Sequence, residues 1–293
     1  MKVKALVVNA FTRSRYGGNP AGVVLDAPLS LKPSQMMKLT RFLSVSETAF
    51  IYPSRVADVK VRFYSPRKEV DLCGHATIAA FYAIASKKMK NLKGRNSVTM
   101  TQETRVGVLP VEVTLKKDEC SMVIMNQGSI VVDDVDWDAS KLSSVLNIKP
   151  GDIDTTLPRQ RVSTGLYTLP VCVKSYDTLK NMKPDFKKIK DLCRCYNVGS
   201  IHVYTFNTLN KYSLYHARNF APLYGVNEDP VTGTANGAVT GYLYLNGLTR
   251  KKRVWCEQGD VIGRPGRVYV EVHDDHIRVG GRATLVSEQE INV

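Results

Sequence analysis

Apolar runs separated by turn residues open the chain. The segments KALVVNAF at 4–11 and GVVLDAP at 22–28 have strand character, and the Gly, Asn and Pro residues between them predict a tight turn. This pattern predicts a hairpin-like opening. Ser30 is a candidate N-cap for a helix running to about Leu43. The apolar face expected for this helix consists of Met36, Met37, Leu39, Phe42 and Leu43.

Strand patterns then recur along the chain. The segments ETAFIYP at 47–53 and VKVRFYSP at 59–66 are predicted strands, and in the second the apolar and charged residues alternate, as on a half-buried strand. The acidic segment at 133–148 predicts a linker leading into a short helix, and a Lys-rich helix is expected between Pro184 and Cys195. Further strands are expected at 97–104, 107–115, 120–126, 161–166, 169–175, 200–207 and 212–222.

Two helical segments lack charge altogether. Residues 76–86 follow the turn at Gly74, and residues 234–245 follow the turn at Gly233. A helix that is apolar on all sides is a buried helix. Each N-terminus presents unpaired backbone N–H groups and a partial positive charge, which together favour a carboxylate or similar anion. Small side chains there would let a ligand approach the backbone.

The repeated plan predicts a pseudo-symmetric pair of α+β lobes, each with a buried helix that follows a glycine turn. We expect an N-terminal lobe at 1–125, to which a C-terminal strand at about 280–293 returns. The C-terminal lobe is expected at 126–279. The active site is expected in the cleft between the lobes.

Composition and charge narrow the classes of partner that the protein could bind. The 293 residues carry 41 Lys and Arg against 27 Asp and Glu, a net charge of +14 that suits nucleic acid or small anions. The basic residues cluster at 87–95, 183–190 and 250–253 without a regular aromatic platform. We therefore expect a small anionic metabolite as partner and no nucleic acid. No segment resembles a secretory signal or a lipid-facing helix, so no membrane association is expected.

The six cysteines form no CxxC pair and lack the spacing of a zinc site, so no metal and a reduced, cytoplasmic environment are expected. They are Cys73, Cys120, Cys172, Cys193, Cys195 and Cys256.

Five blocks in this order resemble the PhzF-like (phenazine biosynthesis) proteins. They are FTRSRYGGNPAGVVL, SVSETAFIYP, VRFYSPRKEVDLCGHATIAA, GVNEDPVTGTANGAVTGYL and EQGDVIGRPGRVYVEV. The resemblance implies a diaminopimelate epimerase-like fold, with two similar lobes that are each a mixed sheet curled around a central buried helix. It also implies an isomerase that moves a proton on a small cyclic or amino carboxylic acid without a cofactor. A homodimer is also expected.

The resemblance also implies particular site residues. The proton-carrying glutamate of the family falls at Glu47, and its site histidine and aspartate fall at His75 and Asp229. The substrate-binding positions fall at Gly74, Gly233 and Thr234. Thr234 keeps a hydroxyl where many relatives have Ser. Asn236 stands where PhzF itself has His, so the substrate is not implied.

Other interpretations of these residues stay open. Glu47 lies at a helix-to-strand junction where exposed glutamates are common, although alternation places it on a face with Ala49 and Ile51. Partial desolvation there would raise a carboxylate pKa and suit it to proton transfer. His75 is either a core histidine or a site residue, with a neutral ring expected at a helix N-terminus. Asp229 is also a candidate turn-former.

Two alternative functions also remain. Cys73 invites a thiol-based amino-acid racemase or epimerase, but such enzymes need a base on each face of the carbon and the EDPVTG turn has no Cys. A lone Cys is more often a small buried residue than a base. The second alternative is a catalytically silent protein of the same fold that binds a ligand or partner.

Overall fold

The computed structural model describes residues 1–88, 92–117 and 119–293. Part of the basic run at 87–95 therefore lies outside the described residues. Among the described residues, no helix is both long enough and apolar enough to cross a bilayer.

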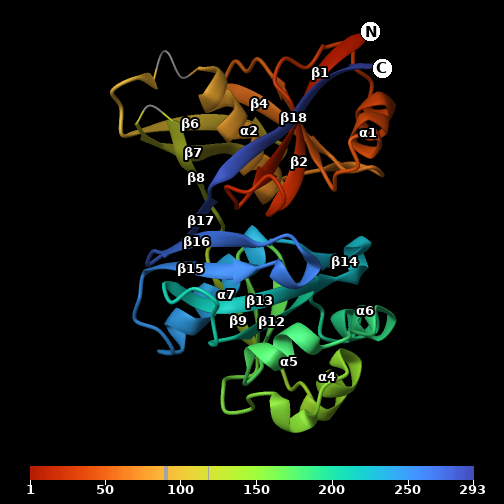
Figure 1. Cartoon of the computed structure of the whole chain (residues 1–293), viewed down its shortest axis with the longest axis vertical. Coiled ribbons are helices and arrows are strands. Elements are labelled where there is room, and N and C mark those ends of the chain that lie inside the picture. Colours follow the sequence, from red (N-terminus) through yellow and green to blue (C-terminus); the bar gives the residue numbers. More distant parts are fainter. Residues whose placement is uncertain (89–91, 118) are drawn as a thin grey trace. The chain divides into compact units, whose positions relative to one another are not determined.

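The chain divides into two units. Unit 1 comprises Met1–Asn126 and Gly280–Val293, and unit 2 comprises Gln127–Val279. Both chain ends belong to unit 1 (Figure 1), where the backbone N–H of Val293 donates to the carbonyl of Met1 over 2.9 Å.

Within the described residues, unit 1 is a mixed sheet with the two helices α1 and α2. Its strands are β1 (Lys2–Ala10), β2 (Asn19–Val24), β3 (Thr48–Tyr52), β4 (Val59–Tyr64), β5 (Glu69–Val70), β6 (Ser97–Thr104), β7 (Gly107–Lys116), β8 (Glu119–Asn126) and β18 (Ala283–Asn292), and its helices are α1 (Pro33–Phe42) and α2 (Gly74–Lys87). β1 pairs antiparallel with β2 and β18, so the predicted hairpin-like opening is confirmed. The β2–β3 and β4–β6 pairings are parallel.

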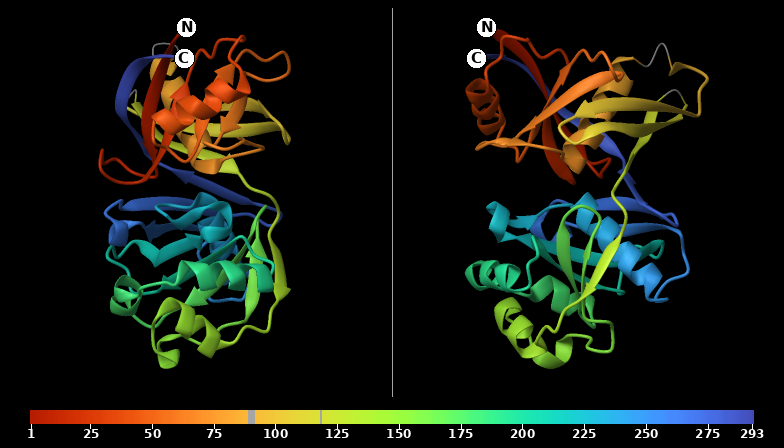
Figure 2. Two further views of the ribbon diagram at one scale, coloured as in Figure 1. Left: turned by 90° about the vertical axis from the view of Figure 1, so that its right-hand side faces the viewer. Right: turned by 180° about the vertical axis from the view of Figure 1, so that it is seen from behind.

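Helix α2 forms the centre of unit 1. Its small apolar side chains are buried from Ala76 to Ala85 except at Tyr82, and it contacts strands across the sheet, from β18 and β1 through β2 and β3 to β7 and β8. The sheet therefore curls around the helix, as the ribbon views also show (Figure 2). The absence of charge predicted this burial correctly, because α2 packs against six strands of the sheet.

Helix α1 begins later than predicted. Its N-cap is Lys32, whose backbone N–H donates to the side chain of Gln35 over 2.9 Å, and Pro33 occupies the first turn. The predicted cap Ser30 is exposed and its hydroxyl contacts the Met1 sulfur. Proline suits a first turn because its missing N–H has no partner to lose there. The predicted apolar face is wrong at Phe42, whose exposed fraction is 63%.

Unit 2 is also a mixed sheet that packs against a buried helix. Its strands are β9 (Val131–Asp134), β10 (Gln160–Ser163), β11 (Tyr167–Cys172), β12 (Ser200–Thr205), β13 (Ser213–Ala221), β14 (Val226–Asp229), β15 (Arg253–Gln258), β16 (Gly266–Val272) and β17 (Ile277–Gly281, which ends in unit 1), and its helices are α4 (Ala139–Leu146), α5 (Tyr176–Asn181), α6 (Phe186–Cys195) and α7 (Gly233–Leu245). The β11–β12 and β13–β15 pairings are parallel, which makes this sheet mixed as well. The predicted acidic linker is wrong at Asp133 and Asp134, because both pair with β10.

The second charge-free helix, α7, is the buried centre of unit 2. It contacts β10, β11, β12 and β16, and Ala235 to Leu243 are buried throughout. Side chains of α4, α5 and α6 form a separate apolar cluster with β11, β12 and β13. Each unit thus has one buried helix against a mixed sheet.

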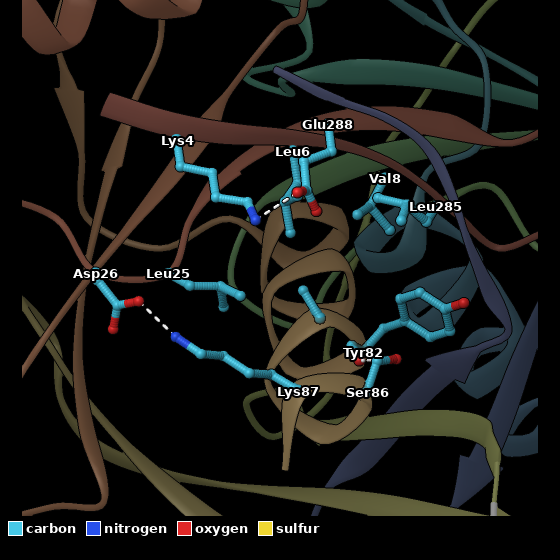
Figure 3. Close-up of a pocket in the computed structure, with 11 residues that line it drawn as sticks. Lys4, Leu6, Val8, Leu25, Asp26, Tyr82, Ser86, Lys87, Leu285 and Glu288 are labelled. Carbon is cyan, nitrogen blue, oxygen red and sulfur yellow. Dashed lines mark hydrogen bonds and ion pairs between the residues drawn. The ribbon is translucent and has the colours of Figure 1, made fainter. Parts of the chain in front are cut away.

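Unit 1 also holds a cavity of about 350 Å³ beside the C-terminal half of α2. Leucine and valine side chains of β1, with Tyr82 and Leu285, form its apolar wall (Figure 3). Two exposed ion pairs, Lys4 with Glu288 and Lys87 with Asp26, lie at its rim. The cavity is lined by none of the predicted site residues.

Candidate functional site

Glu47 is held where β3 begins. Its backbone carbonyl accepts a hydrogen bond from the N–H of Gly22 on β2 over 3.0 Å. A Cβ atom at Gly22 would lie 2.4 Å from the Thr48 hydroxyl oxygen, so only glycine permits this close approach. The Glu47 side chain is 22% exposed, so it is accessible yet partly shielded from water.

His75 lies against Glu47. Its Nε2 atom is 3.4 Å from Glu47 Oε2 and 3.2 Å from the hydroxyl oxygen of Ser46. Its Nδ1 atom is 3.4 Å from the sulfur of Cys73. With 12% of its side chain exposed, the ring sits between a carboxylate and a thiol. Three groups capable of holding or moving a proton therefore lie side by side.

The start of α2 is open at Gly74. Cys73 is the N-cap, and both the backbone N–H and the hydroxyl of Thr77 donate to its carbonyl. A Cβ atom at Gly74 would meet only the Met125 sulfur, at 3.9 Å. No described atom of the protein therefore excludes a larger residue at position 74, and alanine would be the better helix former. The side of Gly74 on which a Cβ atom would lie is therefore open.

The predicted residues of unit 2 gather at the start of α7. Asp229 ends β14, and its carboxylate accepts a hydrogen bond from the hydroxyl of Thr232, the N-cap of α7, over 2.5 Å. Gly233 and Thr234 are the first two residues of the helix. Asp229 and Thr234 are half-buried, whereas Gly233 is buried.

Gln258 is a buried partner of this turn that the sequence did not reveal. Its side chain contacts Asp229, Thr232 and Asn236. Asn236 is fully buried and donates to the Gln258 side chain over 2.7 Å. The position at which this chain differs from PhzF itself is thus occupied by a buried amide. The sequence block that begins at Glu257 could have pointed to Gln258, because this block is one of the five that carry the family resemblance.

Two acidic residues close to Gln258 in the sequence, Glu257 and Asp260, form a buried charged cluster with His216. His216 Nδ1 lies 2.9 Å from Glu257, and its Nε2 contacts Asp260, which also accepts from the Tyr176 hydroxyl. Burial opposes protonation of His216, but hydrogen bonds and charge from Asp260 and Glu257 outweigh it and raise its pKa to about 9. The pKa values of both carboxyls are lowered in spite of burial, chiefly by hydrogen bonds from His216. The cluster therefore carries an imidazolium between two carboxylates near neutral pH.

The structure brings the predicted residues together in two groups. Glu47, Gly74 and His75 meet in unit 1, joined by Cys73, and Asp229 lies with Gly233 and Thr234 in unit 2. Candidate ligand atoms of Glu47, Cys73 and His75 lie within 4.8 Å of one another, so these side chains could share one metal ion. His75 faces its neighbours through different ring nitrogens, an arrangement that suits hydrogen bonding at both nitrogens.

Three thiols of unit 2 are buried. Burial raises the pKa of Cys256 to about 11, and the pKa values of Cys172 and Cys193 to about 12. These thiols are neutral at pH 7 and poor bases. Cys195 is exposed at the end of α6.

The fold is α+β and diaminopimelate epimerase-like, with two units that each hold one buried helix against a mixed sheet. The chain belongs to the phenazine biosynthesis-like protein family, PhzC-PhzF, whose profile matches residues 8–289. This match confirms the resemblance in the five sequence blocks.

Relatives align along almost the whole chain. An uncharacterized isomerase of Clostridium acetobutylicum is 36% identical, with 97% of this chain and 96% of the relative covered. The uncharacterized isomerase YfhB of Bacillus subtilis is 35% identical at the same coverage. The crystal structure of a PhzF-family phenazine biosynthesis protein from Bacillus anthracis is 31% identical, with a TM-score of 0.90 and full coverage of both chains. Together with the fold, these relatives support an isomerase.

Proposed function

We propose that this protein is a cofactor-independent isomerase that moves a proton between carbon atoms of a small cyclic or amino carboxylic acid. Glu47 is the acid/base that carries the proton, and His75 and Asp229 position the substrate. The observation that carries the proposal is the contact between Glu47 and His75 beside the open backbone of Gly74. Family membership supports the same assignment.

The proton transfer has two halves. The Glu47 carboxylate removes a proton from an acidic C–H group, so that a C–H bond breaks, an O–H bond forms and the electron pair delocalises into the substrate. The carboxylic acid then returns the proton to a second carbon of the same π-system. The His75 ring, whose Nε2 atom lies 3.4 Å from the carboxylate, orients it through both halves. A single carboxylate serves one face of the substrate.

The substrate carboxylate requires donors. The first backbone N–H groups of a helix lack intrahelical partners and carry partial positive charge, which suits an anion at Gly74 and at Gly233 and Thr234. The net charge of +14 would increase the local concentration of such an anion.

A thiol-based racemase or epimerase is the second candidate, because Cys73 Sγ lies 3.4 Å from His75 Nδ1. In that mechanism Cys73 would remove or return the proton on one face, and the opposite face would need another base. The two candidates assign the proton to different side chains of one cluster, so substitution separates them.

A substrate screen tests the proposal. Thermal shift with a panel of cyclic and amino carboxylic acids would find ligands. Each ligand would then be incubated with enzyme in deuterium oxide and followed by proton NMR. We expect at least one acid to be isomerised with deuterium incorporated at one carbon. Ligands that stabilise the protein without exchange or conversion would instead indicate a catalytically silent binding protein.

A further inference from the structure

The carboxamide of Gln258 uses its full hydrogen-bonding capacity within the first turn of α7. Its Oε1 atom accepts from the Thr232 backbone N–H over 3.1 Å and from the Asn236 amide over 2.7 Å. Its Nε2 atom donates to the Asp229 carbonyl over 2.8 Å and to the Thr232 hydroxyl oxygen over 3.1 Å. The side chain is 1% exposed, so water does not compete for these bonds.

The direction of each bond is fixed by chemistry. A backbone N–H can only donate, so the atom facing Thr232 N must be the amide oxygen of Gln258. The Thr232 hydroxyl has one hydrogen, which it gives to the Asp229 carboxylate, and it must therefore accept from Gln258. The network thus runs from Gln258 through Thr232 to Asp229. A glutamate in place of Gln258 would keep the acceptor but lose both donors.

The turn that carries Gln258 is itself fixed. Gly259 has φ +95°, and a Cβ atom there would lie 2.5 Å from the Pro230 carbonyl oxygen, so the turn packs directly against the Asp229–Thr232 segment. His216 contacts Glu257 and Asp260, which flank Gln258 and Gly259. Gln258 therefore has little freedom to follow a displaced Asp229.

We propose that Gln258 is a positioning residue that sets the Asp229 carboxylate and the first amide groups of α7 relative to each other. The inference rests on the proposed function, since it deepens the role assigned there to Asp229. Local sequence patterns do not show this contact, because 29 residues separate Gln258 from Asp229.

The test uses two variants of Gln258 and one matched control. Gln258→Met removes all four bonds at similar volume, and Gln258→Glu removes the donors alone. Gln102→Met is the control, because Gln102 is also fully buried but neither amide atom has a hydrogen-bond partner among the described residues. Hydrogen exchange at the Thr232 N–H reports how well the turn is held, and it needs no substrate. The kcat per folded molecule reports whether the Asp229 carboxylate is correctly placed.

We expect at least about tenfold faster exchange at Thr232 in Gln258→Met and retained protection in Gln258→Glu. We expect kcat to fall at least about tenfold in both variants, because both lose the donors to Asp229 and Thr232. Gln102→Met should match the wild type in both readouts. The split between exchange and kcat in Gln258→Glu distinguishes positioning from a general contribution to stability.

Unchanged Thr232 exchange in Gln258→Met, or a kcat within about twofold of the wild type, would overturn the inference. Absence of turnover in the wild type across the whole substrate panel would count against the proposed function alone. In that case the exchange measurement still decides whether Gln258 fixes the turn.

Discussion

The Nε2 atom of His75 lies 3.4 Å from the Oε2 atom of Glu47, although the two residues are far apart in the chain. Helix α2 brings the histidine from its first turn, and the β2–β3 pairing brings the glutamate from the start of β3. The relationship depends on Gly22, which allows the strand carrying Glu47 to approach β2 closely. A carboxylate and an imidazole in this arrangement form a pair suited to proton transfer.

Gly74→Ala should separate stability from ligand binding. The added Cβ meets only the Met125 sulfur at 3.9 Å, and alanine favours a helix, so the free energy of unfolding should rise by up to about 1 kcal/mol. Affinity for a small dicarboxylate such as oxalate, measured by calorimetry, should fall because the methyl group covers the helical amides. Unaltered oxalate affinity would remove Gly74 from the binding site.

Gly237→Ala is the matched control for that substitution. Its Cβ would lie 2.8 Å from a Val279 methyl group inside unit 2, so this variant should be less stable than the wild type. Opposite signs of the two stability changes in denaturant unfolding would confirm that space, rather than helix propensity, distinguishes these glycines.

The His216 cluster predicts a loss of stability in alkali. The pKa of His216 is raised to about 9 in the folded protein, against about 6.5 when unfolded. Its contribution is therefore complete below about pH 6.5 and is lost as the pH rises through about 9, an effect on the order of 3 kcal/mol. Denaturant unfolding at several pH values measures it. His216→Gln should flatten this alkaline slope, and an identical slope in the variant would contradict the assignment.

The basic surface should not make this a nucleic-acid-binding protein. If the positive net charge acts only through general attraction, binding to duplex DNA should be weak. It should fall by roughly three orders of magnitude between low and near-physiological salt if several phosphates are contacted. Fluorescence anisotropy with two unrelated duplexes provides the measurement. Tight, salt-resistant binding to one of them would require a different function.

The sequence predicted the buried helices because composition alone decides their environment. A run such as Ala76–Ser86 without charge has no face to give to water, and α2 and α7 are both buried as expected. The start of α1 was harder to predict. Ser30 has the residue type of an N-cap, but the helix is capped at Lys32, whose backbone N–H donates to the Gln35 side chain. Residue propensities do not reveal that contact.

The supporting network of the candidate site was beyond sequence reasoning. His216 meets carboxylates 41 and 44 residues away. Such pairs depend on the parallel β13–β15 register, in which His216 is opposite Glu257. Alternation along a strand shows which residues share a face but not which strand lies beside it. The roles of Glu47, His75 and Asp229 came from the family resemblance, and they remain predictions.

The central claim is that Glu47 carries the proton while Cys73 does not. The comparison uses Glu47→Gln and Cys73→Ser, with Glu119→Gln as a control on an exposed glutamate of β8. Conversion of the substrate found by the panel would be followed by NMR in deuterium oxide. Circular dichroism would confirm that each variant is folded.

That paired measurement has opposite outcomes for the two mechanisms. We predict that Glu47→Gln lowers turnover at least about a hundredfold, the low end of what a positioned acid/base contributes, while Cys73→Ser keeps most activity. Deuterium should enter on one face of the substrate in every active variant. Loss of turnover in Cys73→Ser with activity retained in Glu47→Gln would contradict the account and establish a thiol-based epimerase.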